Sequence, residues 1–271
     1  WSFRNIDQIE IEKKLEEIMK VKSEEGLNLI RENSREISKE LGLEKAFKKL
    51  DQIIGALLST KESSILRSSE GKKRAEGRPF DVNCISKLEI LFGELRTSVF
   101  EHRIEKSNTN EHFVNKAFFE SYFSNYIEVT TFEIEEAEEI IFDKKIIESR
   151  PKDSHDILGV FNIVSDREEM KRTPNSFQEL IEIIQRRHFI MMKERPEVEP
   201  GKFKEKKNKA GNTTFVDPDY VIGTLEKGFE IYSSLKEVQA KAIFISYLIS
   251  EVHPFNDGNG RLCRIMFNSE L

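Results

Sequence analysis

The chain has 271 residues, of which 34 % are charged and 38 % are hydrophobic, and its formal net charge is −6 at pH 7. This length allows one large domain or two small ones, and the acidic balance, with a sequence pI of about 5.6, argues against nucleic acid as a partner because nucleic-acid binders present a basic surface. Two distant cysteines, Cys84 and Cys263, exclude a disulfide framework, and the lack of a signal peptide or of an apolar run of membrane length favours a cytoplasmic protein without a membrane partner.

Helical periodicity dominates the first part of the chain. Apolar residues recur at helical spacing in residues 11–18, 43–58 and 85–99, as they do on the buried face of amphipathic helices. Residues 68–79 are rich in charge, glycine and proline, have no apolar period and predict a surface linker. Apolar stripes of this kind are typical of a helical core rather than of a binding groove. We therefore assign residues 1–108 to an N-terminal helical region without a predicted role.

Aromatic residues and new helix signals mark residues 109–271 as a second region. Residues 113–123 hold five aromatic side chains. Thr130 and Glu133 have the spacing of a capping box, in which two side chains satisfy backbone amides at the start of a helix. The apolar period then predicts helices at residues 134–141, 157–163, 177–190, 221–235 and 240–249.

A short hairpin is expected where the helical period stops, between residues 200 and 218. Residues 202–206 and 213–216 predict two strands, and the turn residues 208–212 lie between them. By composition alone, this segment is an ordinary surface hairpin. The sequence therefore predicts an all-α fold with one small β-hairpin.

Residues 253–264 combine groups that can bind phosphate and move a proton. Gly258 and Gly260 allow backbone conformations closed to other residues, so successive amides can point into one concavity at a helix N-terminus. The helix dipole favours phosphate there. Asp257 offers the carboxylate oxygens that Mg²⁺ prefers. His253 titrates near neutrality, which makes it the candidate general base.

Two arginines follow, Arg261 and Arg264, and both can address phosphate with a fork of donors that lysine lacks. A Gly-Asn-Gly turn or a histidine before proline is usually structural when it occurs alone. Here eight positions coincide in a fixed order: His253, Phe255, Asp257, Gly258, Asn259, Gly260, Arg261 and Arg264. This order resembles the signature of the Fic family, His-x-Phe-x-Asp/Glu-Gly-Asn-Gly-Arg-x-x-Arg.

The resemblance to the Fic family extends upstream to the hairpin. Fic proteins place a target-docking hairpin, the flap, before the signature, and residues 201–216 occupy that position. The resemblance implies that Phe203, Lys204, Thr213 and Thr214 dock a target through backbone pairing. Changes to the Lys204 side chain are then expected to have mild effects.

Many Fic proteins also carry a self-inhibitory helix with the pattern Ser/Thr-x-x-x-Glu-Gly/Asn. Residues 118–128 resemble this helix and supply Ser124 and Glu128. Val129 departs from the pattern, because a β-branched residue resists the left-handed turn that glycine would allow. The pair Glu70-Gly71 is the weaker alternative, since Leu66 stands four residues before it.

The resemblance implies a protein adenylyltransferase that moves AMP from ATP to a Ser, Thr or Tyr hydroxyl of a target protein, which could be the chain itself. Asp257 would hold Mg²⁺, and His253 would accept the hydroxyl proton. Glu128 would inhibit by forming a bidentate pair with Arg264, which would then be unavailable to the outer phosphates. In this assignment the anion hole is formed by Gly258, Asn259 and Gly260, and the outer phosphates are held by Arg261 and Arg264.

Three other readings stay open. The site could remove AMP from a modified protein, with Glu128 activating water and His253 acting as an acid, or it could transfer another nucleotide or phosphate-bearing group. The chain could also be a nucleotide-sensing regulator, although a sensor has no need of the base His253. The Fic core normally continues with a further helix, so the end at Leu271 predicts a longer natural protein. The sequence leaves the target and the formation of homo-oligomers open.

Overall fold

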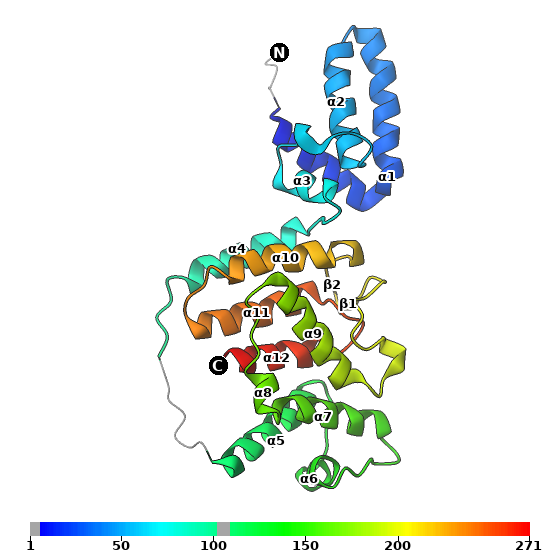
Figure 1. The fold of residues 1–271 in the computed structure, drawn as a ribbon. Helices are drawn as coiled ribbons and strands as arrows, with labels where there is room; N and C mark the ends of the chain where they lie inside the picture. Colours follow the sequence, from blue (N-terminus) through cyan, green and yellow to red (C-terminus); the bar gives the residue numbers. More distant parts are fainter. Residues whose placement is uncertain (1–5, 102–108) are drawn as a thin grey trace. The chain divides into compact units, whose positions relative to one another are not determined.

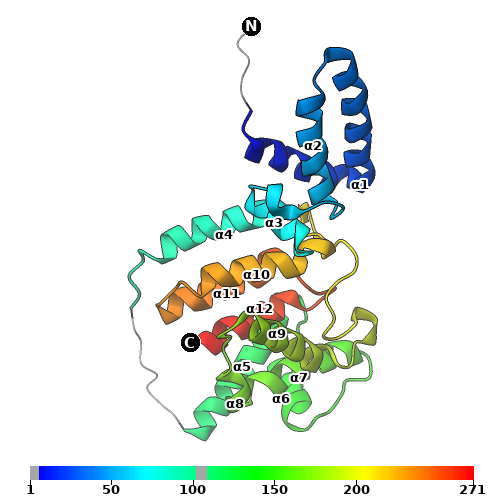
Figure 2. The ribbon, with the colours of Figure 1, turned by 45° about the horizontal axis from the view of Figure 1, so that its top comes forward.

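The computed structural model describes residues 6–101 and 109–271, which form helices and one two-stranded sheet (Figure 1, Figure 2). The predicted all-α class with one small hairpin is confirmed. The chain divides into two compact units, Trp1–Val82 and Asn83–Leu271, each with its own internal packing. The boundary expected at residue 108 lies outside the described residues. None of the described helices has the length and hydropathy needed to cross a membrane.

The described residues of the first unit, 6–82, form three helices and one short 3-10 turn, η1 (Ser63–Ile65). The helices are α1 (Gln8–Leu41), α2 (Glu44–Leu57) and α3 (Ser69–Ala75). Their apolar stripes meet in a core whose buried members are Leu15, Leu27, Ile53, Ile54, Ala56, Leu57 and Leu66. The periodicity expected for residues 11–18 and 43–58 is therefore that of a packed core.

The segment predicted to be a surface linker forms α3 instead. Ser68 caps this helix, because its Oγ accepts a hydrogen bond from the Gly71 amide at 3.0 Å. The Glu12 carboxylate, which is fully buried on α1, accepts from the amides of Arg67 and Ser68 at 3.0 and 2.7 Å. Polar capping bonds hold the segment in place, and an apolar period does not reveal bonds of this kind. Glu70 and Gly71 therefore belong to the packing of the first unit.

The second unit surrounds α11 (Val238–Val252) and α12 (Asn259–Glu270), which pack along each other (Figure 1). The α12 helix also contacts α5, α7, α8 and α9. The remaining helices are α4 (Val82–Leu95), α5 (Asn110–Ile127), α6 (Ile134–Phe142), α7 (Pro151–Val164), α8 (Arg167–Met170), α9 (Phe177–Met192) and α10 (Val221–Tyr232), with 3-10 turns η2 (Pro196–Val198) and η3 (Pro218–Tyr220).

Helix α4 explains why the division between the units comes before residue 108. Lys87 on α4 forms an ion pair with Glu251 at the end of α11, at 2.6 Å. The apolar side of α4 is also buried, at Cys84, Ile85, Leu88 and Leu95. The stripe seen in residues 85–99 therefore belongs to the second unit.

The capping box expected at Thr130 and Glu133 lies three residues later. Helix α6 begins after Glu133, which forms the box with Glu136; the Glu133 amide donates to the Glu136 carboxylate at 3.1 Å. The Thr130 amide instead donates to the Asn125 carbonyl and closes the end of α5. The predicted position of the box was wrong, because Thr130 belongs to the end of α5 and not to the start of α6.

The predicted hairpin is present, with a different first strand. Strands β1 (Lys209–Ala210) and β2 (Thr213–Thr214) pair antiparallel, with Lys209 opposite Thr214 and Ala210 opposite Thr213. Gly211, with a φ of 57°, supplies the left-handed turn between them. Residues 202–206 form no strand, because Lys204 turns inward toward the residues that flank His253.

Candidate functional site

The signature loop starts at the end of α11, where His253 is a left-handed C-cap. Its φ and ψ are 51° and 60°, and its amide donates to the Ile249 carbonyl at 2.9 Å. The imidazole Nδ1 lies 3.4 Å from the Ser250 carbonyl oxygen. Burial lowers the pKa of His253, and the nearby Lys204 ammonium lowers it further. The imidazole is therefore neutral at pH 7 and able to accept a proton.

Phe255 and Asn259 fix the shape of the loop. The Phe255 side chain is fully buried. Its amide donates to Asn259 Oδ1, and its carbonyl accepts from Asn259 Nδ2, both at 2.9 Å. The Asn259 side chain therefore stabilises the loop, and a contribution of this residue to an anion hole would come from its backbone amide.

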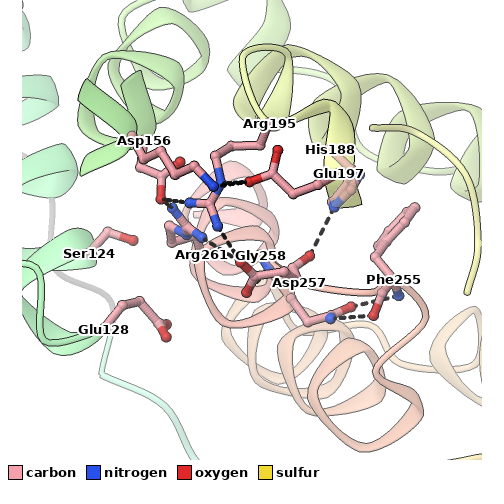
Figure 3. Close-up of polar contacts among 12 residues, drawn as sticks. Ser124, Glu128, Asp156, His188, Arg195, Glu197, Phe255, Asp257, Gly258 and Arg261 are labelled. Atoms are coloured by element: carbon pink, nitrogen blue, oxygen red, sulfur yellow. Dashed lines mark hydrogen bonds and ion pairs between the residues drawn. The ribbon is translucent and has the colours of Figure 1, made fainter. Parts of the chain in front are cut away.

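His188, a residue of α9 that the sequence analysis did not single out, supports the loop from behind (Figure 3). It is fully buried, and its ring stacks on Phe255 with 3.9 Å between the centroids. The Gly201 amide donates to Nδ1 at 2.8 Å, so the other nitrogen, Nε2, donates to the Asp257 carbonyl at 2.9 Å. Burial lowers the pKa of His188 to about 4. A neutral imidazole on α9, in a single tautomer, is thus hydrogen-bonded both to the start of the hairpin and to the signature loop.

Helix α12 presents its N-terminus inside the loop. Gly258 is the N-cap with a φ of 78°, a conformation that costs other residues free energy. Its amide donates to Asp257 Oδ1 at 2.7 Å. The amides of Asn259, Gly260 and Arg261 come next and have no acceptor within the helix. Such an end is an anion-binding site, since the amides and the helix dipole both favour negative charge.

A carboxylate of the protein lies at this anion-binding end. A Cβ atom added to Gly260 would overlap Oε1 of Glu128. The same oxygen accepts from Arg264 Nη2 at 2.6 Å. The glycine therefore lets an anion approach the helix end closely, and in this structure that anion is Glu128.

Ser124 and Glu128 meet Arg264 as the helical spacing predicts. Arg264 donates from Nε to Ser124 Oγ and from Nη2 to the Ser124 carbonyl, both at 2.9 Å. The ion pair with Glu128 uses one carboxylate oxygen, so it is not the bidentate pair expected from the sequence. One turn of α5 thus occupies the guanidinium of Arg264 with three hydrogen bonds.

Val129 adopts the left-handed conformation that its branched side chain was expected to resist. Its φ is 65°, and its side chain is 85 % exposed. The amides of Val129 and Thr130 donate to the carbonyls of Tyr126 and Asn125, which is the bonding pattern of a Schellman motif. These bonds end α5 so that Glu128 reaches the loop, although Val129 stands where glycine would be unstrained.

Arg261 is held in a buried ion-pair network (Figure 3). The Asp156 carboxylate, on α7, accepts from Arg261 Nη1 at 2.6 Å and from Arg195 Nη1 at 2.9 Å through the same oxygen. Arg261 is 4 % exposed, and neither its Nε nor Asp156 Oδ1 has a hydrogen-bond partner among the described residues. Burial raises the pKa of Asp156, against the lowering effect of the two arginines. The geometry thus fixes Arg261 from the protein side, with Arg195 as a second cation beside it.

The Asp257 carboxylate has one oxygen that fits a metal ion. Oδ1 accepts the Gly258 amide, whereas Oδ2 lies 3.4 Å from Arg195 Nη2 and 3.7 Å from Arg261 Nη2. The side chain is 47 % exposed. In the described parts of the chain, no three His, Cys, Asp or Glu residues gather to hold a metal ion by themselves. One accessible carboxylate matches Mg²⁺, which commonly binds through one or two carboxylates, water and substrate phosphates.

The start of the hairpin is joined to the signature loop, which corrects the expectation for Lys204. Its side chain is buried, and its Nζ donates to Asn208 Oδ1 at 2.7 Å. Phe203 packs against Phe255, with 5.3 Å between ring centroids. Thr213 and Thr214 are exposed on β2. Lys204 is therefore part of the packing around the loop, and replacing it is not expected to be mild.

The sequence analysis did not predict three polar residues of this site, Asp156, His188 and Arg195. It named Lys204 for docking but did not predict its packing role. These four residues lie on α7, on α9, after α9 and in the hairpin segment. A polar residue inside a helical pattern normally faces solvent. Nothing local in the sequence distinguishes these residues from exposed ones, and their role follows only from the partners that the fold brings to them.

The segment that contains the hairpin and the signature loop is similar to a known protein family. The model of the Fic/DOC family matches residues 178–271, which include the hairpin, the signature loop and α12. This part of the chain is therefore similar to the Fic/DOC family. No match was found among curated proteins.

Solved Fic structures are similar to the chain at low identity. A Fic family protein from Desulfovibrio desulfuricans is 19 % identical with a TM-score of 0.47, and the match covers 71 % of this chain and 59 % of that protein. A segment of Fic-1 from C. elegans is 16 % identical with a TM-score of 0.49, covering 87 % of this chain and 69 % of that one. The chain thus spans less than two thirds of the length of the first of these proteins.

Proposed function

We propose that this chain is a protein adenylyltransferase that transfers AMP from ATP to a Ser, Thr or Tyr hydroxyl of a target protein. The observation that carries the proposal is the N-terminus of α12, where Gly260 admits a carboxylate oxygen between the helix end and Arg264. A phosphate group is negatively charged like the carboxylate and has more acceptor oxygens. A neutral histidine at the start of the same loop supplies the base that such a transfer requires.

ATP would lie over the signature loop. The amides of Asn259, Gly260 and Arg261 would bind phosphate oxygens, and the guanidinium groups of Arg261 and Arg264 would neutralise the outer phosphates. Asp257 would hold Mg²⁺, which would supply further charge neutralisation when bound. Asp156 supports this arrangement, because it fixes Arg261 before nucleotide binds.

His253 would act at the transferred group. Its imidazole accepts the proton of the target hydroxyl as the hydroxyl oxygen attacks the α-phosphorus. The bond between this phosphorus and the oxygen leading to the β-phosphate breaks, and pyrophosphate leaves. General-base catalysis of this kind contributes about 10²- to 10⁴-fold, so His253→Ala should lose transfer while it retains ATP binding.

Glu128 would inhibit this reaction. Its carboxylate pairs with Arg264 at 2.6 Å, in the position proposed for an outer phosphate. ATP must therefore displace the carboxylate or bind with its phosphates misaligned. Coupling between two such sites is about 1–3 kcal/mol, or roughly 5- to 150-fold. We expect Glu128→Gly to raise AMP transfer by a factor in this range.

Intact-mass spectrometry of the full chain incubated with Mg-ATP tests the proposal. Glu128→Gly should gain the mass of AMP on itself faster than the wild type, and Glu128→Gly combined with His253→Ala should gain none. Glu128→Gln separates the effect of charge from that of shape, and Glu135→Gln is a matched control on the exposed side of α6. A gain of phosphate alone, or no gain in Glu128→Gly with ATP binding shown by calorimetry, would contradict the proposal.

A further inference from the structure

Lys204 holds the peptide groups on both sides of His253. Its backbone amide donates to the Pro254 carbonyl at 2.9 Å, and its Nζ donates to the Val252 carbonyl at 3.3 Å. The same Nζ bonds to Asn208 Oδ1, and Asn208 Nδ2 donates to the Phe255 carbonyl at 3.0 Å. Residues 252, 254 and 255 are therefore all bonded to one side of the hairpin, and His253 lies between these bonds.

Phe215, at the other end of the hairpin, holds the ring of His253. The two rings stack with 3.7 Å between centroids and 6° between planes. Lys204 Nζ lies 6.0 Å from the centroid of the same phenyl ring. The Phe215 amide donates to the Asn208 carbonyl at 3.3 Å, so the stacking residue is attached to the segment that carries Lys204.

We propose that Lys204 and Phe215 are positioning residues for His253: they fix its strained backbone and its ring plane. The Lys204 ammonium group also favours the neutral imidazole, which can accept a proton. This inference rests on the proposed role of His253 as the base. It gives the hairpin a second task besides target docking, because the hairpin also builds the surroundings of the reacting group.

The charged groups around His253 predict the direction of this effect. Lys204 is the cation that lowers the pKa of His253, whereas the Asp257 and Glu128 carboxylates and the Ser250 carbonyl raise it, and burial lowers it most. Loss of the Lys204 charge should therefore raise the pKa of His253. A neutral side chain of similar length could fill the same space, but it could not lower the pKa of His253 as the ammonium group does.

NMR titration of the His253 ring in the nucleotide-free full chain tests the charge effect. The pKa of His253 should be higher in Lys204→Met than in wild type, and it should be unchanged in Lys206→Met, which removes an exposed lysine two residues away. Lys204→Arg, which keeps the positive charge, should give a pKa of His253 that is closer to the wild-type value than that of Lys204→Met. A pKa in Lys204→Met that is equal to or below that of Lys206→Met overturns the proposal.

A second measurement needs no variant at Lys204. Burial lowers the pKa of Lys204 to about 8, so raising the pH from 7 to 9 should neutralise it and produce a second inflection in the His253 ring signals. A titration of Lys204 that leaves the His253 signals unchanged would also overturn the charge effect. This measurement decides the question if Lys204→Met fails to fold.

Transfer assays test the positioning effect and separate it from the proposed function. In the Glu128→Gly background, Phe215→Leu should lower AMP transfer by about 10- to 100-fold through misplacement of the ring, while calorimetry shows unchanged ATP affinity. Transfer at the rate of the Glu128→Gly parent would overturn the role of Phe215. If no form of the chain transfers AMP, the proposed function fails, and the NMR titrations still decide the role of Lys204.

Discussion

Val129 is a residue whose side chain opposes the backbone that it adopts. A left-handed conformation costs a non-glycine residue about 1–2 kcal/mol. Glycine avoids this cost but loses more conformational entropy on folding, which offsets about 0.5–1 kcal/mol of the gain. We expect Val129→Gly to stabilise the second unit by about 1 kcal/mol or slightly less, as measured by urea unfolding. Val129→Thr, which keeps the branched Cβ, is the matched control.

The same change should also affect the inhibition that we propose for Glu128. With less strain at the end of α5, Glu128 is held more firmly on Arg264, so AMP transfer by Val129→Gly should be lower than that of wild type. Equal stability of the glycine and threonine variants would show that Val129 carries no strain in solution.

His188 predicts how the stability of the second unit depends on pH. Its pKa in the folded chain is about 4, below the ordinary value of about 6.5, so between these values the unfolded chain binds a proton that the folded chain does not. The stabilising effect is complete above pH 6.5 and is lost as the pH falls toward 4. Between pH 7 and 5 this loss amounts to about 2 kcal/mol.

Comparison with His188→Gln isolates this contribution, because the amide side chain can replace one hydrogen bond and does not titrate. Urea unfolding followed through NMR signals of α9 and α12 should show a smaller loss between pH 7 and 5 in His188→Gln than in wild type. Identical pH dependence in the two proteins would mean that His188 is not the neutral, bonded group described here.

At the scale of elements, the hairpin has a backbone edge at which we expect a target protein to dock. Phe215 bonds inward to Asn208, and antiparallel pairs alternate between inward and outward bonding. The amide of Thr214, opposite Lys209, therefore points outward. A target strand can pair with such an edge by strand addition.

Proline at this position tests the docking role. In the Glu128→Gly background, Thr214→Pro removes the outward amide without removing an inward bond of the hairpin, so modification of a protein target should fall while ATP affinity is retained. Thr214→Val is the control, since it keeps the amide. Equal losses of ATP affinity and target modification would mean that the hairpin is only structural.

At the scale of the whole molecule, the site is built from residues of one unit. Every residue placed at the site, from Ser124 to Arg264, lies in Asn83–Leu271. We expect residues 83–271, produced alone, to bind Mg-ATP with the affinity of the full chain in calorimetry. Asp257→Ala in this fragment should weaken Mg-ATP binding and leave metal-free ATP binding less affected.

The outcome of this experiment assigns a role to the first unit. A folded fragment that has lost Mg-ATP binding would show that residues 1–82 support the site. Unchanged binding would leave the first unit for a task other than nucleotide binding, since it supplies none of the residues described above.

Much of the site could be predicted because it is local. Residues 253–264 are consecutive, and the order of the glycines, the aspartate and the histidine predicts a candidate anion site at a helix end. Helical spacing likewise places Ser124 and Glu128 on one face of α5, and the structure brings both to Arg264. The apolar period predicted the helical class for the same reason, since each helix records its buried face in its own sequence.

The sequence by itself thus determined the helical class, the order of residues in the signature loop and the shared helix face of Ser124 and Glu128, all of which depend on residues within a few turns of one another. Only the tertiary structure decided which buried polar groups serve the loop: Asp156 on Arg261, His188 behind Asp257 and Lys204 beside His253. Each of these bonds joins residues that are distant in the chain. The hydrophobic period does not predict which polar side chains are buried, because their burial depends on partners that folding brings to them.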